Sequence, residues 1–202
     1  MDPQKKTVDA KERDTLARLL FRDMAQTLVA KRLVVVDESS TPLDMTSAYA
    51  RAPRGQRAYA KVLRNYGTNA SLIAALRLDG MDAAFVVDGS VNMAVLEAYV
   101  EHILAPTLHV GAIVLMDNLS CHKAESVRHL IEARAASVLF VPAYSPDCSP
   151  IEQAFSKLKQ SLRRTKALTF EAFLDAIAAA LQTISPSDAI GYFCAAGFLN
   201  FD

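Results

Sequence analysis

Short apolar runs that stop abruptly constrain the fold of this chain more than any other feature of its sequence. Residues 32–37 read Arg-Leu-Val-Val-Val-Asp, residues 111–117 read Gly-Ala-Ile-Val-Leu-Met-Asp, and a third run occupies residues 137–141 before Pro142. Continuous runs of roughly four to eight apolar, often β-branched residues are typical of strands, and the first of these runs suits a central strand that is buried on both faces. We therefore expect a sheet that is covered by helices.

The remaining segments predict how this sheet is completed. The dipeptide Asp79-Gly80 separates apolar runs over residues 71–78 and 81–87 and predicts a tight hairpin. Further strands are expected over residues 43–50 and 58–62, around a Pro-Gly turn. Helical periodicity is found in five segments, at residues 10–31, 91–106, 123–134, 151–164 and 170–184. This order of elements predicts an α/β fold with a mixed sheet flanked by helices.

Composition narrows the class of protein. The 202 residues carry 22 Lys and Arg against 22 Asp and Glu, so bulk positive charge does not drive nucleic-acid binding, although a local basic stripe could. The apolar runs fall well short of the ~20 residues of a membrane-spanning helix, and residues 1–11 lack a signal-peptide core. Three cysteines without Cys-x-x-Cys spacing predict reduced thiols. We expect a soluble cytoplasmic protein with no membrane association.

Three acidic residues are placed where chemistry could occur. Asp37 and Asp117 end two of the apolar runs, and Glu152 lies in the first turn of the helix that follows the last strand. In an open α/β sheet the strand ends line the crevice where ligands bind, so these carboxylates could meet there. Two carboxylates ~4 Å apart repel each other by ~4 kcal/mol at an effective dielectric of about 20, so such a cluster holds protons or divalent metal. Oxygen ligands favour Mg²⁺ or Mn²⁺ over zinc.

Each acid also has a simpler interpretation. Asp37 and Asp117 could be ordinary turn residues, because Asp is common where strands give way to turns. Glu152 could close a capping box with Ser149, with Pro150 in the first helical position. Taken one at a time, the acids therefore do not establish an active site.

The helix that carries Glu152 adds a second observation. Ser156, Lys159 and Arg163 fall within ~40° of Glu152 around the helix axis, at 100° per residue. A carboxylate beside a basic stripe suits a site that holds metal and a phosphate backbone. A solvated charged face would produce the same pattern.

Three sequence blocks contain these acids. They read Val-Val-Val-Asp37-Glu-Ser, Ile-Val-Leu-Met-Asp117-Asn-Leu-Ser-Cys-His122-Lys and Val-Pro-Ala-Tyr144-Ser-Pro-Asp147-Cys-Ser-Pro-Ile-Glu152-Gln-Ala-Phe-Ser-Lys157-Leu-Lys159. The blocks, their order and the 34 residues between Asp117 and Glu152 resemble the catalytic domain of bacterial insertion-sequence transposases of the mariner-like superfamily. The resemblance covers roughly residues 30–195.

The resemblance implies a fold, an activity and partners. The fold would be ribonuclease H-like, a mixed five-stranded sheet flanked by helices, and Asp37, Asp117 and Glu152 would be an Asp-Asp-Glu triad that binds two Mg²⁺ or Mn²⁺ ions. The activity would be DNA transposition, in which water attacks a phosphodiester at the transposon end and the freed 3′-hydroxyl attacks target DNA. The partners would be double-stranded transposon ends and target DNA, held by a homodimer associated with the nucleoid.

The chain departs from the family pattern at three places. Ser39-Ser40 stands where Thr-Gly is usual, and Ser149 stands where Asn usually precedes Pro-Ile-Glu. The residues before Arg32 are too few for the paired helix-turn-helix modules that recognise transposon ends. We therefore expect residues 1–31 to form a lead-in helix and residues 32–202 the catalytic domain. Sequence-specific DNA binding would then belong to a separate chain, or this chain would be a fragment.

Further residues are candidates for DNA contact under this resemblance. Asn118 and His122 follow Asp117 closely enough to line the same pocket. Tyr144 could stack on an unpaired base, or it could fill the turn in which it lies. The chain's basic concentration could contact the phosphate backbone, or it could be a solubilising helix face; its members include Lys157, Lys159 and Arg163.

Two rival functions remain open from the sequence. The chain could be a catalytically inactive or truncated transposase remnant that acts as a DNA-binding or regulatory subunit, although all three acids are retained. It could also be a phosphatase that uses Asp37 as a nucleophile and resembles the haloacid dehalogenases. Such enzymes carry a second Asp where this chain has Ser39, which disfavours that alternative.

Overall fold

A computed structural model describes residues 14–42, 53–57, 69–118, 124–165, 167 and 169–202. Within these residues a five-stranded sheet has the strand order β3-β2-β1-β4-β5. The strands are β1 (Leu33–Pro42), β2 (Asn69–Arg77), β3 (Gly80–Asp88), β4 (Ile113–Met116) and β5 (Ser137–Phe140). Strand β1 pairs antiparallel with β2 and parallel with β4, β2 pairs antiparallel with β3, and β4 pairs parallel with β5. The expected mixed sheet is confirmed.

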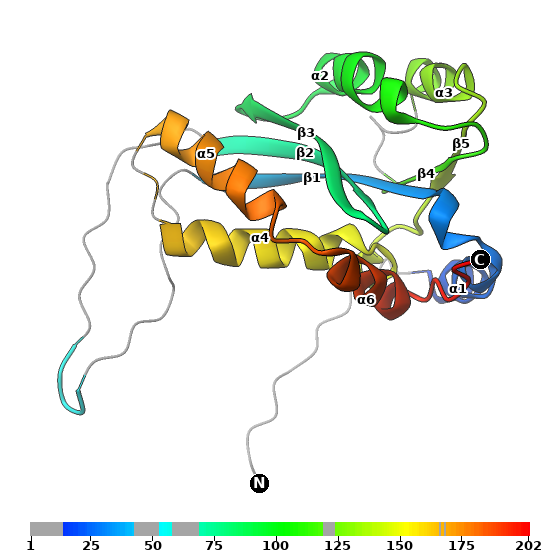
Figure 1. Ribbon diagram of the computed structural model, residues 1–202. Coiled ribbons are helices and arrows are strands. Elements are labelled where there is room, and N and C mark those ends of the chain that lie inside the picture. The colour runs from blue at the N-terminus through cyan, green and yellow to red at the C-terminus, as the bar shows by residue number, and fades with distance from the viewer. Residues whose placement is uncertain (1–13, 43–52, 58–68, 119–123, 166, 168) are drawn as a thin grey trace, which may run out of the picture.

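Helices cover both faces of this sheet (Figure 1). One face carries α2 (Met93–Tyr99), which continues through a π-helical turn and a 3₁₀ turn, and α3 (Glu125–Glu132). The other face carries α4 (Ile151–Thr165), α5 (Phe170–Leu181) and α6 (Pro186–Ala196). Among the residues that the structure describes, none of the helices has both the length and the hydrophobicity that crossing a membrane requires. The predicted α/β class is confirmed.

Strand β1 shows how the sheet separates two hydrophobic cores. Val34 and Val36 pack on the α2–α3 side, whereas Leu33 and Val35 pack on the side of α4, α5 and α6. All four side chains are at most 1% exposed, which confirms that this apolar run is a central strand. Because side chains alternate along a strand, the next residue in the Leu33–Val35 series, Asp37, points to the α4 side.

The hairpin predicted at Asp79-Gly80 is confirmed by the pairing of β2 with β3. Gly80 has a φ of +134°, in the region that favours glycine. A Cβ atom at this position would lie 3.1 Å from the carbonyl oxygen of Ile184. Both the backbone conformation and the close approach therefore require glycine at the turn.

Strand β1 is longer than the apolar run that predicts it. The run ends at Val36, yet the strand continues to Pro42 because β2 pairs with it along its whole second half. Ser39 and Thr41 are buried in this extension. Asp37 therefore lies inside the strand and not at its end, which corrects the prediction. The strands expected over residues 43–50 and 58–62 lie outside the described residues.

Helix α6 was not predicted, because the sequence interpretation ended with a helix to Ile184. A capping box begins α6: Ser185 Oγ accepts the backbone N–H of Asp188 at 3.1 Å, and the carboxylate of Asp188 accepts the backbone N–H of Ser185 at 2.9 Å. Gly197, with a φ of +98°, follows its last turn. Both are ordinary sequence signals for a helix start and stop.

Helix α1 (Thr15–Thr27) packs against the C-terminal segment of the chain. The rings of Phe21 and Phe198 meet edge to face with their centroids 6.3 Å apart. The backbone N–H of Ala30 donates to the carbonyl oxygen of Asn200 at 2.7 Å. Figure 1 shows α1 beside the C-terminus, and Phe21 and Ala25 of this helix belong to the same hydrophobic core as α4, α5 and α6.

Candidate active site

Asp37 and Asp117 are neighbours at the centre of the sheet. Strands β1 and β4 run parallel, with Val35 opposite Leu115. The same register continued by two residues sets Asp37 beside Asp117, which directly follows the last residue of β4. Adjacent strands are about 4.8 Å apart, so the sheet alone brings these two carboxylates together.

Glu152 approaches the same place from the start of α4. This helix buries Ile151 and Phe155 in the core and leaves Glu152 exposed in its first turn. The backbone N–H of Glu152 donates to the carbonyl oxygen of Ser149 at 3.4 Å. Among the described hydrogen bonds, neither of the two side-chain bonds of a capping box joins Ser149 to Glu152. The structure does not support the capping interpretation of Glu152.

The three acids line one pocket of about 480 Å³. This pocket lies past the end of β4, where open α/β sheets bind their ligands. Its wall also includes residues of β1, the end of β4 and the segment before α4, namely Glu38, Asn118, Val141, Pro142, Ala143, Tyr144, Ser145, Pro146 and Ser149. The structure thus brings together Asp37, Asp117 and Glu152, which are far apart in the sequence.

The carboxyl group of Asp37 has a strongly shifted pKa. Burial raises the pKa from 3.8 to about 7, with added repulsion from the charges of Asp117, Glu152 and Glu38. One contact acts in the opposite direction, because the backbone N–H of Glu38 donates to Asp37 Oδ1 at 2.7 Å and stabilises the ionised form. A buried carboxylate among acidic neighbours needs a proton or a cation near neutral pH.

The donor atoms of the pocket fit a hard divalent cation. Asp37, Asp117 and Glu152 offer carboxylate oxygens and Asn118 offers an amide oxygen, which are ligand types that Mg²⁺ and Mn²⁺ prefer. Within the described part of the chain, no group of three or more His, Cys, Asp or Glu side chains is arranged to hold a metal ion. The three carboxylates share a pocket but not one coordination point, so binding a cation would require their side chains to turn toward it.

Tyr144 lies in the pocket wall with an unusual backbone conformation. Its φ is +54°, in the left-handed region, and its side chain is an exposed aromatic group, 59% accessible to solvent. Such conformations cost energy in bulky residues and cluster at functional sites. Asn118 lines the same pocket, as the sequence predicts. His122 lies outside the described residues.

The basic residues of α4 fall into two groups. Lys157 donates to Asp188 Oδ2 at 2.8 Å and to the carbonyl oxygen of Thr183 at 2.9 Å, and so joins α4 to the start of α6. Its hydrogen bond holds the pKa of Asp188 well below the usual range. The structure therefore gives Lys157 contacts within the fold, which favour a structural role over the expected DNA contact. Lys159 and Arg163 form no ion pair with any described residue.

Two features, one in the pocket wall and one beside it, are not predicted from the sequence. Glu38 adds a fourth carboxylate, and its position directly after Asp37 was a visible signal. Asp147 binds Arg18 of α1 through both carboxylate oxygens. No local pattern indicates this second feature, because the two residues are 129 positions apart.

Comparisons with known proteins agree with this geometry. The family described as DDE superfamily endonuclease matches residues 32–174, and no curated protein sequence matches the chain. The Mos1 transposase paired-end complex with left transposon end has a TM-score of 0.78 at 17% identity, covering 98% of this chain and 64% of that chain. The Mos1 mariner paired end complex with Mn has a TM-score of 0.77 at 17% identity, covering 96% and 63%. The Mos1 transposase catalytic domain with Raltegravir and Mg has a TM-score of 0.72 at 16% identity, covering 94% and 92%.

These similarities cover different shares of the matched chains. The chain spans just under two thirds of the Mos1 chains in the paired-end complexes and about nine tenths of the isolated Mos1 catalytic domain. At these identities the likeness concerns the fold, and it confirms the expected ribonuclease H-like architecture. The family match covers more than two thirds of the chain and includes Asp37, Asp117 and Glu152. The chain therefore belongs to the DDE superfamily endonuclease family.

Proposed function

We propose that this chain is the catalytic domain of a DNA transposase that hydrolyses phosphodiester bonds at transposon ends and joins the ends to target DNA. The observation that carries the proposal is the single pocket lined by Asp37, Asp117 and Glu152, in which burial and, to a lesser extent, acidic neighbours raise the pKa of Asp37. A divalent cation would stabilise such a cluster, because its positive charge permits all three carboxyl groups to ionise near neutral pH.

Asp37, Asp117 and Glu152 would hold Mg²⁺ or Mn²⁺, two ions in the complex with DNA. When bound, divalent ions activate a water or hydroxyl and stabilise the leaving oxygen of a phosphoryl transfer. The chain's own groups fix the geometry: the Glu38 N–H orients the carboxylate of Asp37, and the β1–β4 register fixes its distance from Asp117. This chemistry requires no covalent bond between DNA and the protein.

The DNA would follow the rim of the pocket and the adjoining face of α4. Lys159 and Arg163 lie within about 40° of Glu152 around the helix, so their charges are on the side of α4 that begins at the pocket. Lys157 is five residues after Glu152 and points about 140° away, which agrees with its contact to α6. Asn118, His122 and Tyr144 would approach the DNA closest to the reacting phosphate.

Two solved structures that resemble this chain are paired-end complexes of Mos1, one of them with a transposon end. By analogy, we propose that two copies of this chain hold two DNA ends. Residues 32–202 would be the catalytic domain and residues 1–31 its lead-in helix. Sequence-specific recognition of the ends would come from modules outside the matched fold or from a separate chain.

The proposal is tested by nicking of supercoiled DNA in Mn²⁺ or Mg²⁺ by the chain and by Glu152→Gln. We expect metal-dependent conversion to open circles by the unchanged chain and near-complete loss in Glu152→Gln. Glu171→Gln is the matched control, because it makes the same Glu-to-Gln substitution at an exposed first-turn position of α5, outside the pocket. Equal nicking by Glu152→Gln and the unchanged chain would refute the proposal, and no nicking by either would favour an inactive DNA-binding remnant.

A further inference from the structure

A buried arginine of α1 is bound to the segment that forms the pocket wall. Arg18 Nη1 donates to Asp147 Oδ1 at 2.9 Å and Arg18 Nη2 donates to Asp147 Oδ2 at 2.6 Å. The side chain of Arg18 is only 10% exposed, whereas Asp147 is 42% exposed. Arg22 adds one bond to Asp147 Oδ2, at 2.8 Å, from an exposed side chain. A paired, two-point contact of this kind fixes orientation as well as distance.

Asp147 is connected to Glu152 through consecutive hydrogen-bonded turns of the backbone. It lies in the 3₁₀ turn Pro146–Cys148, between the pocket-lining residues Tyr144 and Ser149. The backbone N–H of Ser149 donates to the carbonyl oxygen of Pro146 at 3.0 Å, and the next such bond runs from Glu152 to Ser149. A shift of Asp147 would therefore move the first turn of α4, where Glu152 is placed.

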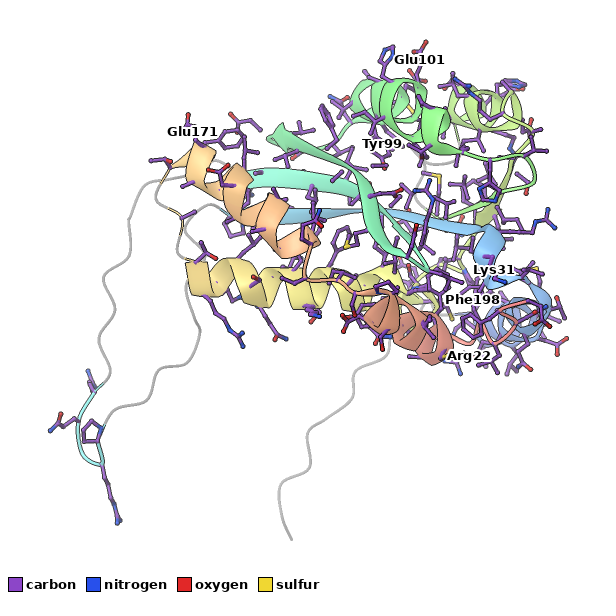
Figure 2. All side chains as sticks on the ribbon, in the orientation of Figure 1. Arg22, Lys31, Tyr99, Glu101, Glu171 and Phe198 are labelled. Carbon is purple, nitrogen blue, oxygen red and sulfur yellow. The ribbon has the colours of Figure 1, made fainter. Side chains whose placement is uncertain are left out.

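The other end of this contact is anchored away from the pocket. Helix α1 is fixed by the edge-to-face contact of Phe21 with Phe198 and by the bond between Ala30 and Asn200. Figure 2 shows Arg22 and Phe198 together at the end of the molecule where α1 meets the C-terminal segment. Arg18 and Phe198 both lie outside the residues that the family match covers. The support of the pocket wall thus comes from elements that flank the residues covered by the family match.

We propose that Arg18 is a positioning residue: by holding Asp147 it sets the place of Glu152 relative to Asp37 and Asp117, and so the affinity of the pocket for a divalent cation. This inference rests on the proposed function, because it acts through the metal-binding role of Glu152. A buried guanidinium remains charged and presents its donors in a rigid planar fork, which suits it to this task. Arg22 adds a second positive charge beside Asp147, but its single hydrogen bond does not fix the orientation of the Asp147 carboxylate.

The experiment is titration calorimetry of Mn²⁺ into the full chain, with Arg18→Met, Arg18→Lys and Arg22→Met compared in the original and Glu152→Gln backgrounds. Circular dichroism first establishes a temperature at which every variant is folded. Because supporting residues of metal ligands typically change affinity 10–100-fold, we expect Arg18→Met to weaken Mn²⁺ binding about tenfold and Arg22→Met to change it less than about twofold. Arg18→Lys, which keeps the charge but not the two-point contact, should recover only part of the loss.

The decisive result is the dependence on Glu152. If Arg18 acts by placing Glu152, Arg18→Met has little further effect in the Glu152→Gln background. An equal loss in both backgrounds, or unchanged Mn²⁺ binding by Arg18→Met, would overturn the positioning role. Should Arg18→Met not fold, Asp147→Asn carries the same test from the other partner. If Glu152→Gln alone leaves Mn²⁺ binding unchanged, the metal site itself is wrong, and the role of Arg18 falls with it.

Discussion

The ammonium group of Lys157 lies 2.8 Å from Oδ2 of Asp188 and fastens α4 to the start of α6. Lys159, two residues later, lies on the side of the helix that begins at the acidic pocket. Two lysines with the same chemistry therefore have different predicted roles, one in the fold and one in DNA binding. The pair provides a matched comparison within a single helix.

We predict that Lys159→Ala and Arg163→Ala weaken the binding of duplex DNA and lower its dependence on salt by about one counterion each, because each removes a phosphate contact. Lys157→Ala should lower the melting temperature and leave the salt dependence of DNA binding unchanged. Fluorescence anisotropy over a range of salt concentrations and thermal melts separate the two effects. A Lys157→Ala protein that loses as much DNA affinity as Lys159→Ala would contradict this division.

The shifted pKa of Asp37 predicts that the metal-free protein is less stable at high pH. The folded state holds this proton up to about pH 7, whereas the unfolded chain releases it near pH 4. The stability that protonation provides is therefore complete below pH 4 and is lost as the pH rises through 7. Between pH 5 and pH 8 the loss amounts to about 3 kcal/mol, at 1.36 kcal/mol per pKa unit. Urea unfolding in EDTA measures it.

Asp37→Asn isolates this effect from the other titrating groups. The amide has a similar shape and carries no charge, so the fall in stability between pH 5 and pH 8 should shrink by most of that amount. Mn²⁺ should restore the stability of the unchanged chain at pH 8 but not that of Asp37→Asn. An identical pH dependence in both proteins would show that Asp37 is not the group responsible.

Tyr144 is predicted to contribute its ring to DNA binding. Tyr144→Phe keeps the ring and should bind a DNA end with unpaired bases as well as the unchanged chain, while Tyr144→Ala should lose about 1–3 kcal/mol of stacking. Tyr144→Gly removes the ring but relieves the left-handed backbone, by roughly 1 kcal/mol of stability. If Ala and Phe at this position bind the DNA end equally, the ring has no contact with a base.

Phe198 tests whether the C-terminal segment belongs to the core of the catalytic fold. Its side chain is fully buried against Phe21 and Phe193, so Phe198→Ala should lower the free energy of unfolding by about 3–5 kcal/mol. The next residue, Leu199, is exposed, and Leu199→Ala should change stability by less than about 0.5 kcal/mol. Denaturant unfolding of both variants measures these changes in the free energy of unfolding. Similar losses in the two would mean that the segment does not pack as described.

Local patterns were enough to predict most of the sheet. The apolar runs at β2, β3, β4 and β5 specify strands because each run is short and bounded by turn residues. The second half of β1 was missed because its polar residues are held in the sheet by pairing with β2, which no local pattern encodes. Helix α6 has its capping signals in Ser185, Asp188 and Gly197, although the sequence prediction does not include this helix.

The sequence was sufficient to predict the parts of the candidate site that depend on individual residues. Asp37, Asp117 and Glu152 follow from the ends of two apolar runs, a helix start and the spacing of a known family. The contacts of Lys157 with Asp188 and of Arg18 with Asp147 depend on how α6 and α1 dock on the core. Neither docking is encoded by neighbours in the sequence, so the contact of Lys157 with α6 and the support of the pocket wall were not predicted.

The most direct test of the central claim is anomalous diffraction from crystals of the chain equilibrated with MnCl₂. We predict an anomalous peak inside the pocket with oxygen ligands from Asp37 and Asp117, and Glu152 turned toward it from α4. The same crystals of Glu152→Gln should show a weaker or altered peak. Manganese bound elsewhere, or held in the pocket with Asp37 or Asp117 directed away from it, would contradict the account.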